Sequence, residues 1–213
     1  MPRSGSSKRW LARQSRDPYV KRARAGGWRS RGAFKLMELD RRWRLLRPGL
    51  TVVDLGAAPG GWSQVAAQRV GAPGRVLAVD LTFLEPLAGV TRLQGDLTHR
   101  ETVAAIERWT DGALDLVLCD MAPNLSGVRV VDQARSLELA ERVLDLATRW
   151  LTPQGALVIK LFEGEGVAAW RDLARARYER VEVTKPGASR RGSREIYAFC
   201  GRKRGSLVGP VNV

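Results

Sequence analysis

From Leu50 onward, apolar strand-like runs alternate with amphipathic helix-like segments, and this alternation constrains the fold more than any other feature of the chain. A helix between successive strands carries the chain back across a sheet, so the strands are predicted to run parallel. The predicted strands are residues 51–55, 75–81, 90–93, 114–120, 156–162, 180–183 and 195–200. The predicted helices are residues 32–46, 61–69, 101–109, 131–150 and 166–177. We therefore predict an α/β fold with a mostly parallel seven-stranded sheet and helices on both faces.

Several functional classes are disfavoured by what the sequence lacks. No run approaches the roughly 20 apolar residues of a membrane span, and the N-terminus has no apolar signal-peptide core. The two cysteines, Cys119 and Cys200, lie in apolar runs and form no disulfide framework, which fits a reducing compartment. His99 is the single histidine, so we predict neither a metal centre nor a Ser-His-Asp triad.

Basic residues give the chain a formal net charge of +14 and are concentrated towards its two ends. The first cluster is Arg3, Lys8, Arg9, Arg13, Arg16, Lys21, Arg22, Arg24, Arg29, Arg31 and Lys35, and the second is Lys185, Arg190, Arg191, Arg194, Arg202, Lys203 and Arg204. Trp10, Tyr19 and Trp28 are interleaved with the first cluster, and arginine beside aromatic rings suits phosphate contacts and base stacking. A solubilising tail or an Arg-rich targeting peptide would also be basic, but two clusters on one small domain favour nucleic acid.

The segment from Thr51 to Ser63 runs from an apolar strand through small residues into a helix, where a doubly wound fold binds its ligand. Asp80 follows Gly60 by twenty residues and ends the next predicted strand, a position from which a carboxylate can accept hydrogen bonds from ribose hydroxyls. The glycine spacing is Gly-x-x-x-Gly-Gly, unlike the Gly-x-Gly-x-x-Gly of pyrophosphate binders. Asp54 would repel a phosphate and attract a sulfonium or ammonium group. S-adenosylmethionine therefore fits better than a nicotinamide dinucleotide.

Two further carboxylates follow short apolar runs and are expected at the same edge of the sheet. Asp96 could hold an adenine amino group, although an ordinary helix N-cap would explain it equally well. Asp120 could face the methionyl end of the ligand and the reacting centre, because Pro123 and Asn124 follow it as in loops after catalytic strands.

Motifs from about Lys8 to Arg204 together resemble the FtsJ/RrmJ (RlmE) family of ribosomal RNA ribose 2′-O-methyltransferases. The matching blocks are Arg29-Ser30-Arg31, Phe34-Lys35-Leu36, residues 54–64, Gln94-Gly95-Asp96, Asp120-Met121-Ala122-Pro123-Asn124, Gly164-Glu165-Gly166 and Ser193-Arg194-Glu195. The sequence departs at Glu163, where well-studied members carry glutamine. The resemblance implies a Rossmann-like fold that uses S-adenosyl-L-methionine and binds no metal.

The resemblance also implies residue roles. A catalytic Lys-Asp-Lys-Glu tetrad falls on Lys35, Asp120, Lys160 and Glu195. Adding the nucleoside motif, the expected cofactor contacts are Asp54, Gly56, Gly60, Gly61, Trp62, Asp80, Leu81, Asp96, Leu97 and Asp120. We divide the chain into a basic, partly flexible RNA-binding segment (residues 1–30), a methyltransferase domain (residues 31–204) and a short C-terminal tail (residues 205–213).

The position of Lys160 supports a catalytic role on physical grounds. It ends the apolar run from Ala156 to Ile159, which is an expensive place for a charge without a partner. With Asp120 and Glu195 as partners, Lys160 could accept the ribose 2′-hydroxyl proton during in-line attack on the sulfonium methyl. Alternatively, it could stay charged and stabilise the developing oxyanion.

We expect the target to be a uridine of large-subunit (23S-type) rRNA in the ribosomal particle. The alternatives are a tRNA ribose 2′-O-methyltransferase, a catalytically silent RNA-binding assembly factor and a nicotinamide-dependent dehydrogenase. We expect a bacterial cytoplasmic monomer without a stable protein partner; a mitochondrial protein is the less favoured alternative, because the resemblance begins close to the N-terminus.

Overall fold

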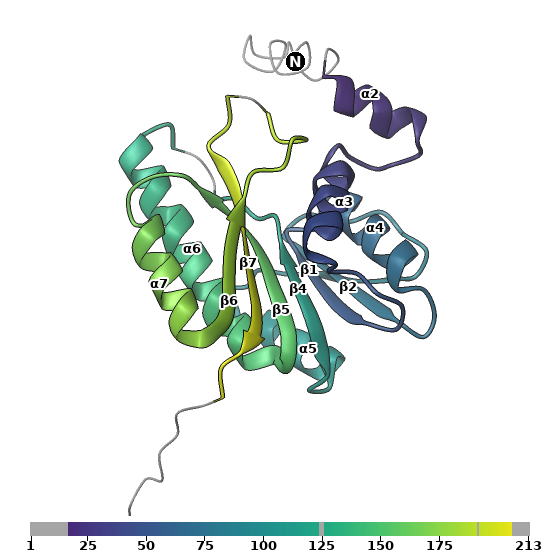
Figure 1. The fold of residues 1–213 in the computed structure, drawn as a ribbon. Helices are drawn as coiled ribbons and strands as arrows, with labels where there is room; N and C mark the ends of the chain where they lie inside the picture. The colour runs from purple at the N-terminus through teal and green to yellow at the C-terminus, as the bar shows by residue number, and fades with distance from the viewer. Residues whose placement is uncertain (1–16, 124–125, 191, 206–213) are drawn as a thin grey trace, which may run out of the picture.

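The computed structural model describes residues 17–123, 126–190 and 192–205, and these form one seven-stranded sheet with helices on both faces (Figure 1). The strand order is β3-β2-β1-β4-β5-β7-β6. The strands are β1 (Thr51–Leu55), β2 (Arg75–Asp80), β3 (Val90–Gln94), β4 (Leu114–Cys119), β5 (Leu151–Phe162), β6 (Tyr178–Thr184) and β7 (Glu195–Lys203). Strands β1 to β5 pair in parallel, whereas β7 runs antiparallel to both β5 and β6. The predicted mostly parallel α/β sheet is confirmed.

The sheet is buried between two helical layers (Figure 1). The helices are α2 (Pro18–Ala25), α3 (Gly32–Trp43), α4 (Gly61–Val70), α5 (Arg100–Thr110), α6 (Arg129–Trp150) and α7 (Val167–Arg177). Alternate residues of each strand face opposite layers. Val158 and Tyr197 pack with α3 and α4, whereas Ile159 and Ala198 pack with α5, α6 and α7. A residue's place in this alternation therefore decides which helical layer its side chain meets.

The helix predicted over residues 32–46 is shorter in the structure, where α3 ends at Trp43. Arg44 adopts a left-handed conformation (φ 54°, ψ 53°), and its N–H donates to the Asp40 carbonyl. The Asp40 carboxylate then accepts the Leu46 N–H at 2.8 Å, and Leu46 turns into the core. This local cap therefore ends α3 at Trp43, although the apolar pattern of the sequence continues to Leu46.

The sequence prediction missed helix α2, which lies within the segment expected to be partly flexible. Asp17 caps it by accepting the Tyr19 N–H, and Pro18 occupies the first turn, where its missing N–H costs nothing. Tyr19 packs against Phe34 of α3, with ring centroids 5.7 Å apart. Predicted basic residues before Asp17, together with Trp10, Asn124 and Arg191, lie outside the described residues.

Four strands, β3, β5, β6 and β7, are longer than predicted because pairing extends past their apolar residues. Strand β5 begins at Leu151, opposite Leu114 of β4, and β7 continues to Lys203, which pairs with Tyr178 of β6. The parallel strands nevertheless end at one common edge of the sheet, as the alternating pattern requires. None of the described helices is long and apolar enough to cross a membrane.

Candidate active site

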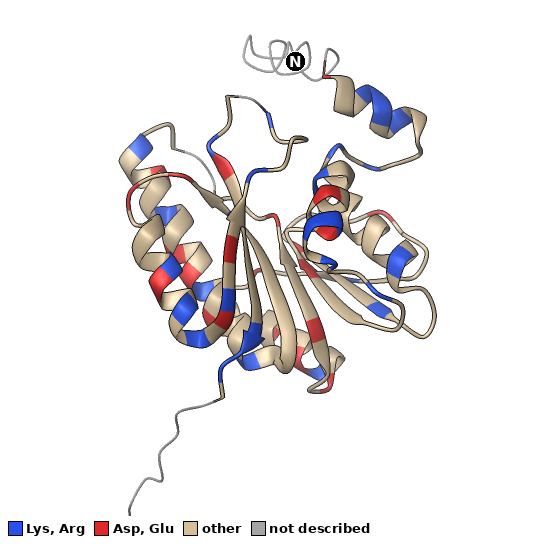
Figure 2. Ribbon diagram, in the orientation of Figure 1, with Lys and Arg blue, Asp and Glu red and all other residues tan. Residues whose placement is uncertain are grey.

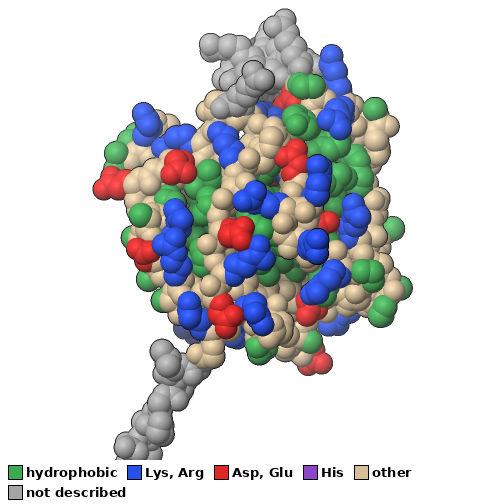
Figure 3. Space-filling model, viewed as in Figure 1, with side chains coloured by type: hydrophobic (Ala, Val, Ile, Leu, Met, Phe, Trp, Pro, Cys, Tyr) green, Lys and Arg blue, Asp and Glu red, His purple; other side chains and the backbone are tan. Residues whose placement is uncertain are grey.

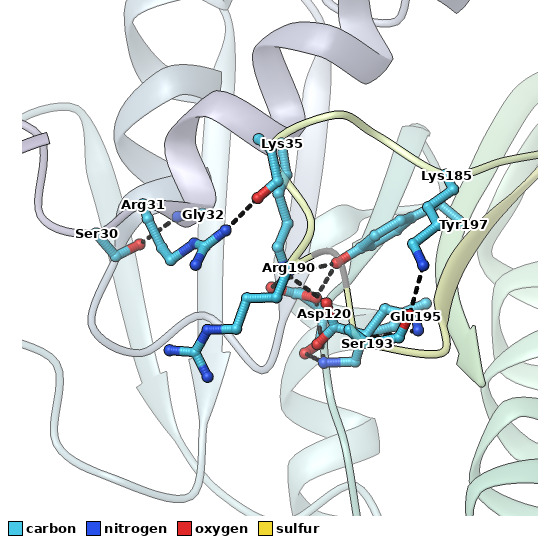
Figure 4. A network of polar contacts seen from close by, with 12 residues as sticks. Ser30, Arg31, Gly32, Lys35, Asp120, Lys185, Arg190, Ser193, Glu195 and Tyr197 are labelled. Carbon is cyan, nitrogen blue, oxygen red and sulfur yellow. Dashed lines mark hydrogen bonds and ion pairs between the residues drawn. The ribbon is translucent and has the colours of Figure 1, made fainter. Parts of the chain in front are cut away.

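The four residues of the predicted tetrad come together at the common edge of the sheet, on the side covered by α3. Figure 4 shows three of them, Lys35, Asp120 and Glu195. Asp120 directly follows β4, and its backbone N–H donates to the Leu55 carbonyl. Lys160 belongs to β5, Glu195 begins β7, and Lys35 reaches the group from α3. Residues far apart in the sequence are thus brought together by strand register and one helix.

The tetrad is joined by short polar contacts. Lys160 Nζ lies 3.2 Å from Asp120 Oδ1 and donates to the Asp120 carbonyl oxygen at 2.5 Å. Lys35 Nζ lies 3.3 Å from Glu195 Oε2 and 3.8 Å from Asp120 Oδ2. Two ammonium groups and two carboxylates therefore balance in charge. This balance lowers the free-energy cost of keeping the four side chains together where they are partly shielded from water.

Burial within the tetrad is uneven. The lysine side chains are the more enclosed, with 10% of Lys35 and 8% of Lys160 exposed, against 22% for each carboxylate. An ammonium group in such surroundings needs oxygen partners, and Asp120 supplies them to Lys160. The site is therefore open enough at the carboxylates for a substrate to reach it.

Tyr197, which no sequence motif singled out, lies at the centre of this network. Its hydroxyl donates to Asp120 Oδ1 at 2.7 Å and accepts from Lys35 Nζ at 2.9 Å. Burial, followed by the nearby Asp120 charge, raises the pKa of Tyr197 well above its usual value, so the hydroxyl keeps its proton. The period of two on β7 places Tyr197 on the same face as Glu195, and this signal could have identified it.

A cavity of about 510 Å³, here called the first cavity, opens beside Asp120 at the ends of β1, β2 and β4. Its lining residues are Gly56, Val79, Asp80, Leu81, Gly95, Asp96, Leu97, Thr98, Asp120, Met121, Ala122, Pro123, Arg135, Glu138, Leu139 and Arg142. Six of the predicted cofactor contacts are among them: Gly56, Asp80, Leu81, Asp96, Leu97 and Asp120. Its volume falls within the roughly 300–1,000 Å³ typical of small-molecule sites.

Both rim carboxylates are fixed by their own loops. Asp80 accepts the Ala58 N–H through Oδ2 and the Thr82 N–H and hydroxyl through Oδ1. Asp96 accepts the Thr98 N–H at 2.7 Å, and this backbone hydrogen bond lowers the pKa of the Asp96 carboxyl. Helix α5 begins later, with His99 at its N-cap, so Asp96 is not the N-cap of that helix. Both carboxylates are held at the mouth of the first cavity.

The other four predicted cofactor contacts, Asp54, Gly60, Gly61 and Trp62, are not among the residues that line the first cavity. Gly60 has φ +106°, and a Cβ there would lie 3.0 Å from Arg29, while a Cβ on Gly61 would meet the Ser30 side chain. Trp62 is buried and donates its Nε1–H to the Gly32 carbonyl at 2.9 Å. In the structure these three residues pack α4 against the start of α3 and the segment before it.

Asp54 lies beneath the site, fully buried in β1. Its Oδ2 accepts the Ser63 hydroxyl at 2.6 Å, and Oδ1 has no hydrogen-bond partner among the described residues. Desolvation raises the pKa of Asp54 from 3.8 to about 7. A role for its charge in attracting a cationic ligand therefore stays a prediction.

The two basic clusters, which are distant in sequence, meet next to the tetrad. Arg31 pairs with Asp17 and donates to the Ala188 carbonyl, while Arg190 lies 3.9 Å from the same Asp17 carboxylate. The Ala188 N–H donates to Glu38 of α3 at 3.2 Å. Arg31 and Glu38 therefore anchor the β6–β7 loop to the α2–α3 region.

We call the resulting region the basic surface: Lys21, Arg22, Arg24, Lys185 and Arg190. The ribbon in Figure 2 is blue at Lys and Arg positions of α2 and the β6–β7 loop, and Figure 3 shows basic side chains interspersed over this face of the molecule. The β6–β7 loop leads directly into Glu195, and Figure 4 places Lys185 and Arg190 beside the tetrad.

Comparison with known proteins identifies the family. The FtsJ-like methyltransferase family matches residues 28–203, which include all four tetrad residues. The chain belongs to the FtsJ-like methyltransferase family. The predicted resemblance and the Rossmann-like methyltransferase fold are thereby confirmed.

Relatives of this methyltransferase match nearly its whole length. It is 54% identical over 198 residues to ribosomal RNA large subunit methyltransferase E of Azoarcus sp. (strain BH72), covering 92% of this chain and 97% of the relative. It is 50% identical over 206 residues to the protein of the same name from Hahella chejuensis, covering 96% and 100%. The fold is shared with a ribosomal RNA methyltransferase structure from Plasmodium falciparum at TM-score 0.75 and 24% identity, covering 83% and 98% of the two chains.

Proposed function

We propose that this methyltransferase transfers the methyl group of S-adenosylmethionine to a ribose 2′-hydroxyl of RNA, at a uridine of large-subunit rRNA. One observation carries the proposal: Asp120 both lines the first cavity and contacts the two lysines of the tetrad. A small molecule held in the cavity would thus lie next to groups able to handle a hydroxyl proton.

The residues present in the first cavity fit an adenosyl cofactor. Asp80 keeps unused lone pairs for ribose hydroxyls, because each carboxylate offers about four acceptor positions. Asp96 likewise keeps acceptor capacity beyond its contacts with Thr98 and can accept an adenine amino group. Leu81 and Leu97 supply apolar walls for a ring. When bound, the cofactor supplies an activated methyl group on a sulfonium.

The tetrad would position and activate the attacking hydroxyl. The carboxylate and the backbone carbonyl of Asp120 both contact Lys160 Nζ, and these two contacts fix the position of the Lys160 side-chain nitrogen. Lys35 contacts Asp120 Oδ2 and the Tyr197 hydroxyl donates to Oδ1, so both help to hold the Asp120 carboxylate in place. Lys160 can accept the ribose proton or, if it stays charged, stabilise the developing oxyanion. Positioning of the hydroxyl for in-line attack contributes much of the rate in either case.

Lys160→Arg separates these two roles. A guanidinium keeps the charge and does not deprotonate at neutral pH. Retention of a substantial part of kcat in Lys160→Arg would therefore assign the oxyanion role, whereas loss equal to that of Lys160→Ala would assign proton acceptance.

The choice of RNA rests on the basic surface and on the relatives. Cations beside the tetrad would neutralise phosphates of a bound strand. The relatives that match most of this chain are named for methylation of large-subunit ribosomal RNA. A tRNA substrate would use the same chemistry and is the second candidate.

The complete, interconnected tetrad argues against a catalytically silent assembly factor, because such a protein would have no use for paired lysines at this edge. Membership of a methyltransferase family removes the reason to consider a nicotinamide-dependent dehydrogenase.

Methyl transfer to defined RNA pools tests the proposal. Purified protein is incubated with tritiated S-adenosylmethionine and either large ribosomal subunits or tRNA from a strain lacking this protein. We expect label in large-subunit rRNA and none in tRNA. Label in tRNA alone would replace the substrate, and no label in either pool would contradict the proposed function.

A further inference from the structure

A second cavity of about 740 Å³ lies between the start of α6 and the connection from β5 to α7. Its lining residues are Arg129, Val130, Gln133, Ala134, Leu137, Gly164, Glu165, Gly166 and Arg194. None of these residues lines the first cavity, and none is a tetrad residue. The proposed methyl transfer therefore leaves the second cavity without a role.

Helix α6 separates the two cavities. Residues 135, 138, 139 and 142 form a stripe that faces the first cavity, whereas residues 129, 130, 133, 134 and 137 form a stripe that faces the second. Both stripes follow the three- and four-residue spacing of one helix face. The second cavity is thus a distinct site and no extension of the first.

The floor of the second cavity is built by specific contacts. Gln133 Nε2 donates to the Phe162 carbonyl at 3.0 Å and to the Glu165 carbonyl at 3.1 Å, which ties the β5–α7 connection to α6. Gly166 has φ +83°, and a Cβ there would collide with Leu137. Gln133 Oε1 is itself buried and lies close to Gly164, so Gln133 shapes the floor and presents no exposed acceptor to the cavity.

The second cavity adjoins the tetrad across the edge of the sheet. Arg194, on its rim, immediately precedes Glu195, and the Glu163 N–H donates to the Arg194 carbonyl at 2.8 Å. Glu195 pairs in register with Phe162, two residues beyond Lys160. An RNA strand that presents a ribose to Lys160 would therefore continue over this edge.

The lining of the second cavity combines apolar walls with cations at the rim, as a nucleotide requires. Val130 is 77% exposed and Leu137 adds a further apolar wall, while Arg129 and Arg194 place cations at the rim. A base has an apolar face and polar edges, and it is linked to an anionic phosphate; sequence-specific RNA recognition commonly uses such splayed bases. An acidic protein segment would match the two arginines but would leave the apolar walls uncovered.

We propose that the second cavity binds a base of the RNA substrate that flanks the methylated nucleotide, and that it contributes to substrate specificity. This inference rests on the proposed RNA methyltransferase function. The base packs against Val130 and Leu137, and its phosphate lies at Arg129 or Arg194.

Filling the second cavity tests this inference. Ala134 is exposed on α6, so Ala134→Trp should fold normally while occupying the space for the base. With large subunits from a strain lacking the protein, we expect KM to rise about tenfold or more, because a stacked base contributes roughly 1–3 kcal/mol. We expect kcat and the Kd for S-adenosylmethionine to stay within twofold. Arg129→Ala should raise KM less.

Arg108→Ala is the matched control for Arg129→Ala, because Arg108 is exposed near the end of α5 and lines neither cavity. If the unaltered enzyme is active and Ala134→Trp has the same KM for the large subunit, the second-cavity proposal is overturned and the proposed function still stands. No methylation of RNA ribose by unaltered enzyme would overturn this proposal together with the proposed function.

A photo-crosslinking side chain at Val130 identifies the occupant directly. Irradiation with the same large subunits should give a crosslink to rRNA within about three nucleotides of the methylated position. A crosslink to a ribosomal protein, or to rRNA remote from that position, would contradict the proposal.

Discussion

The tetrad and the basic surface lie at the same edge of the sheet, yet they are held there by different kinds of contact. Tetrad side chains extend from β5, β7, α3 and the end of β4, and they contact one another directly. The basic surface is anchored mainly through the β6–β7 loop, where Arg31 and Glu38 contact the backbone of Ala188.

This difference matches what each region is proposed to do. Methyl transfer needs atoms fixed to within fractions of an ångström, and partly buried side chains that contact one another provide that. Phosphate binding tolerates adjustment because its energy comes from charge and counterion release. A change in the tetrad should therefore reduce kcat, whereas a change in the basic surface should raise KM and alter salt dependence.

Lys160→Ala should produce the largest effect on the rate. Removal of a group that accepts a proton or stabilises the oxyanion typically lowers kcat by about 10²–10⁴-fold. The Kd for S-adenosylmethionine, measured by calorimetry, should change little, because Lys160 does not line the first cavity. Comparable turnover in the variant would remove Lys160 from the active site.

Asp54→Asn tests how much free energy of unfolding is lost by burying the Asp54 carboxylate in β1. Burial raises the pKa of Asp54 from its ordinary value of 3.8 to about 7, so between these values the folded state holds a proton that the unfolded state lacks. The free energy of unfolding must then fall as pH rises through this window and stay low above it.

The asparagine variant lacks this titration. Relative to the unaltered protein it should gain stability between about pH 4 and pH 7, by up to about 4 kcal/mol. Urea unfolding at several pH values measures the difference. A constant difference from pH 4 to pH 8 would show that Asp54 ionises normally in the fold.

Neutralising Lys21, Arg22 and Arg24 of the basic surface to glutamine should raise KM for RNA about tenfold at moderate salt, with kcat unchanged. The plot of log affinity against log salt should become shallower by about 0.9 for each phosphate that the variant no longer neutralises. Arg47, between α3 and β1, and Arg69 and Arg108, in the last turns of α4 and α5, are exposed, and the same change at these three residues is the control. An unchanged salt slope would exclude α2 from RNA binding.

Tyr197→Phe should have the smallest effect on the kinetic constants, and it tests whether Tyr197 acts with the tetrad or with the basic surface. It removes one hydroxyl that bridges Asp120 and Lys35, so kcat should fall about fivefold, consistent with roughly 1 kcal/mol for a hydrogen bond. KM and the salt dependence should not change. A change confined to KM would place Tyr197 with substrate binding instead.

Much of the fold could be predicted because strand and helix periods differ clearly in this sequence. The chain from Leu50 to Phe162 shows the strand-to-helix alternation, and the strand ends located Asp80, Asp96 and Asp120 at one edge. The end of α3 could not be found in this way, because its cap depends on the Asp40 side chain and a left-handed Arg44.

The candidate site was predictable in part. Motif matching found the tetrad, but Tyr197 was overlooked because an aromatic residue in an apolar strand looks like core. The meeting of the two basic clusters depends on the contacts of Arg31 with Asp17 and Ala188, which join residues up to 157 positions apart. Sequence spacing carries no information about such contacts.

The most direct test of the central claim is the position of the transferred methyl on the ribose. Large-subunit rRNA labelled by this protein with tritiated S-adenosylmethionine is hydrolysed in alkali, which cleaves a phosphodiester only where the neighbouring 2′-hydroxyl is free. We predict that the label is recovered in one alkali-resistant dinucleotide whose 5′ nucleoside is 2′-O-methyluridine. Recovery of the label in mononucleotides would place the methyl on a base and contradict the proposed role of the tetrad.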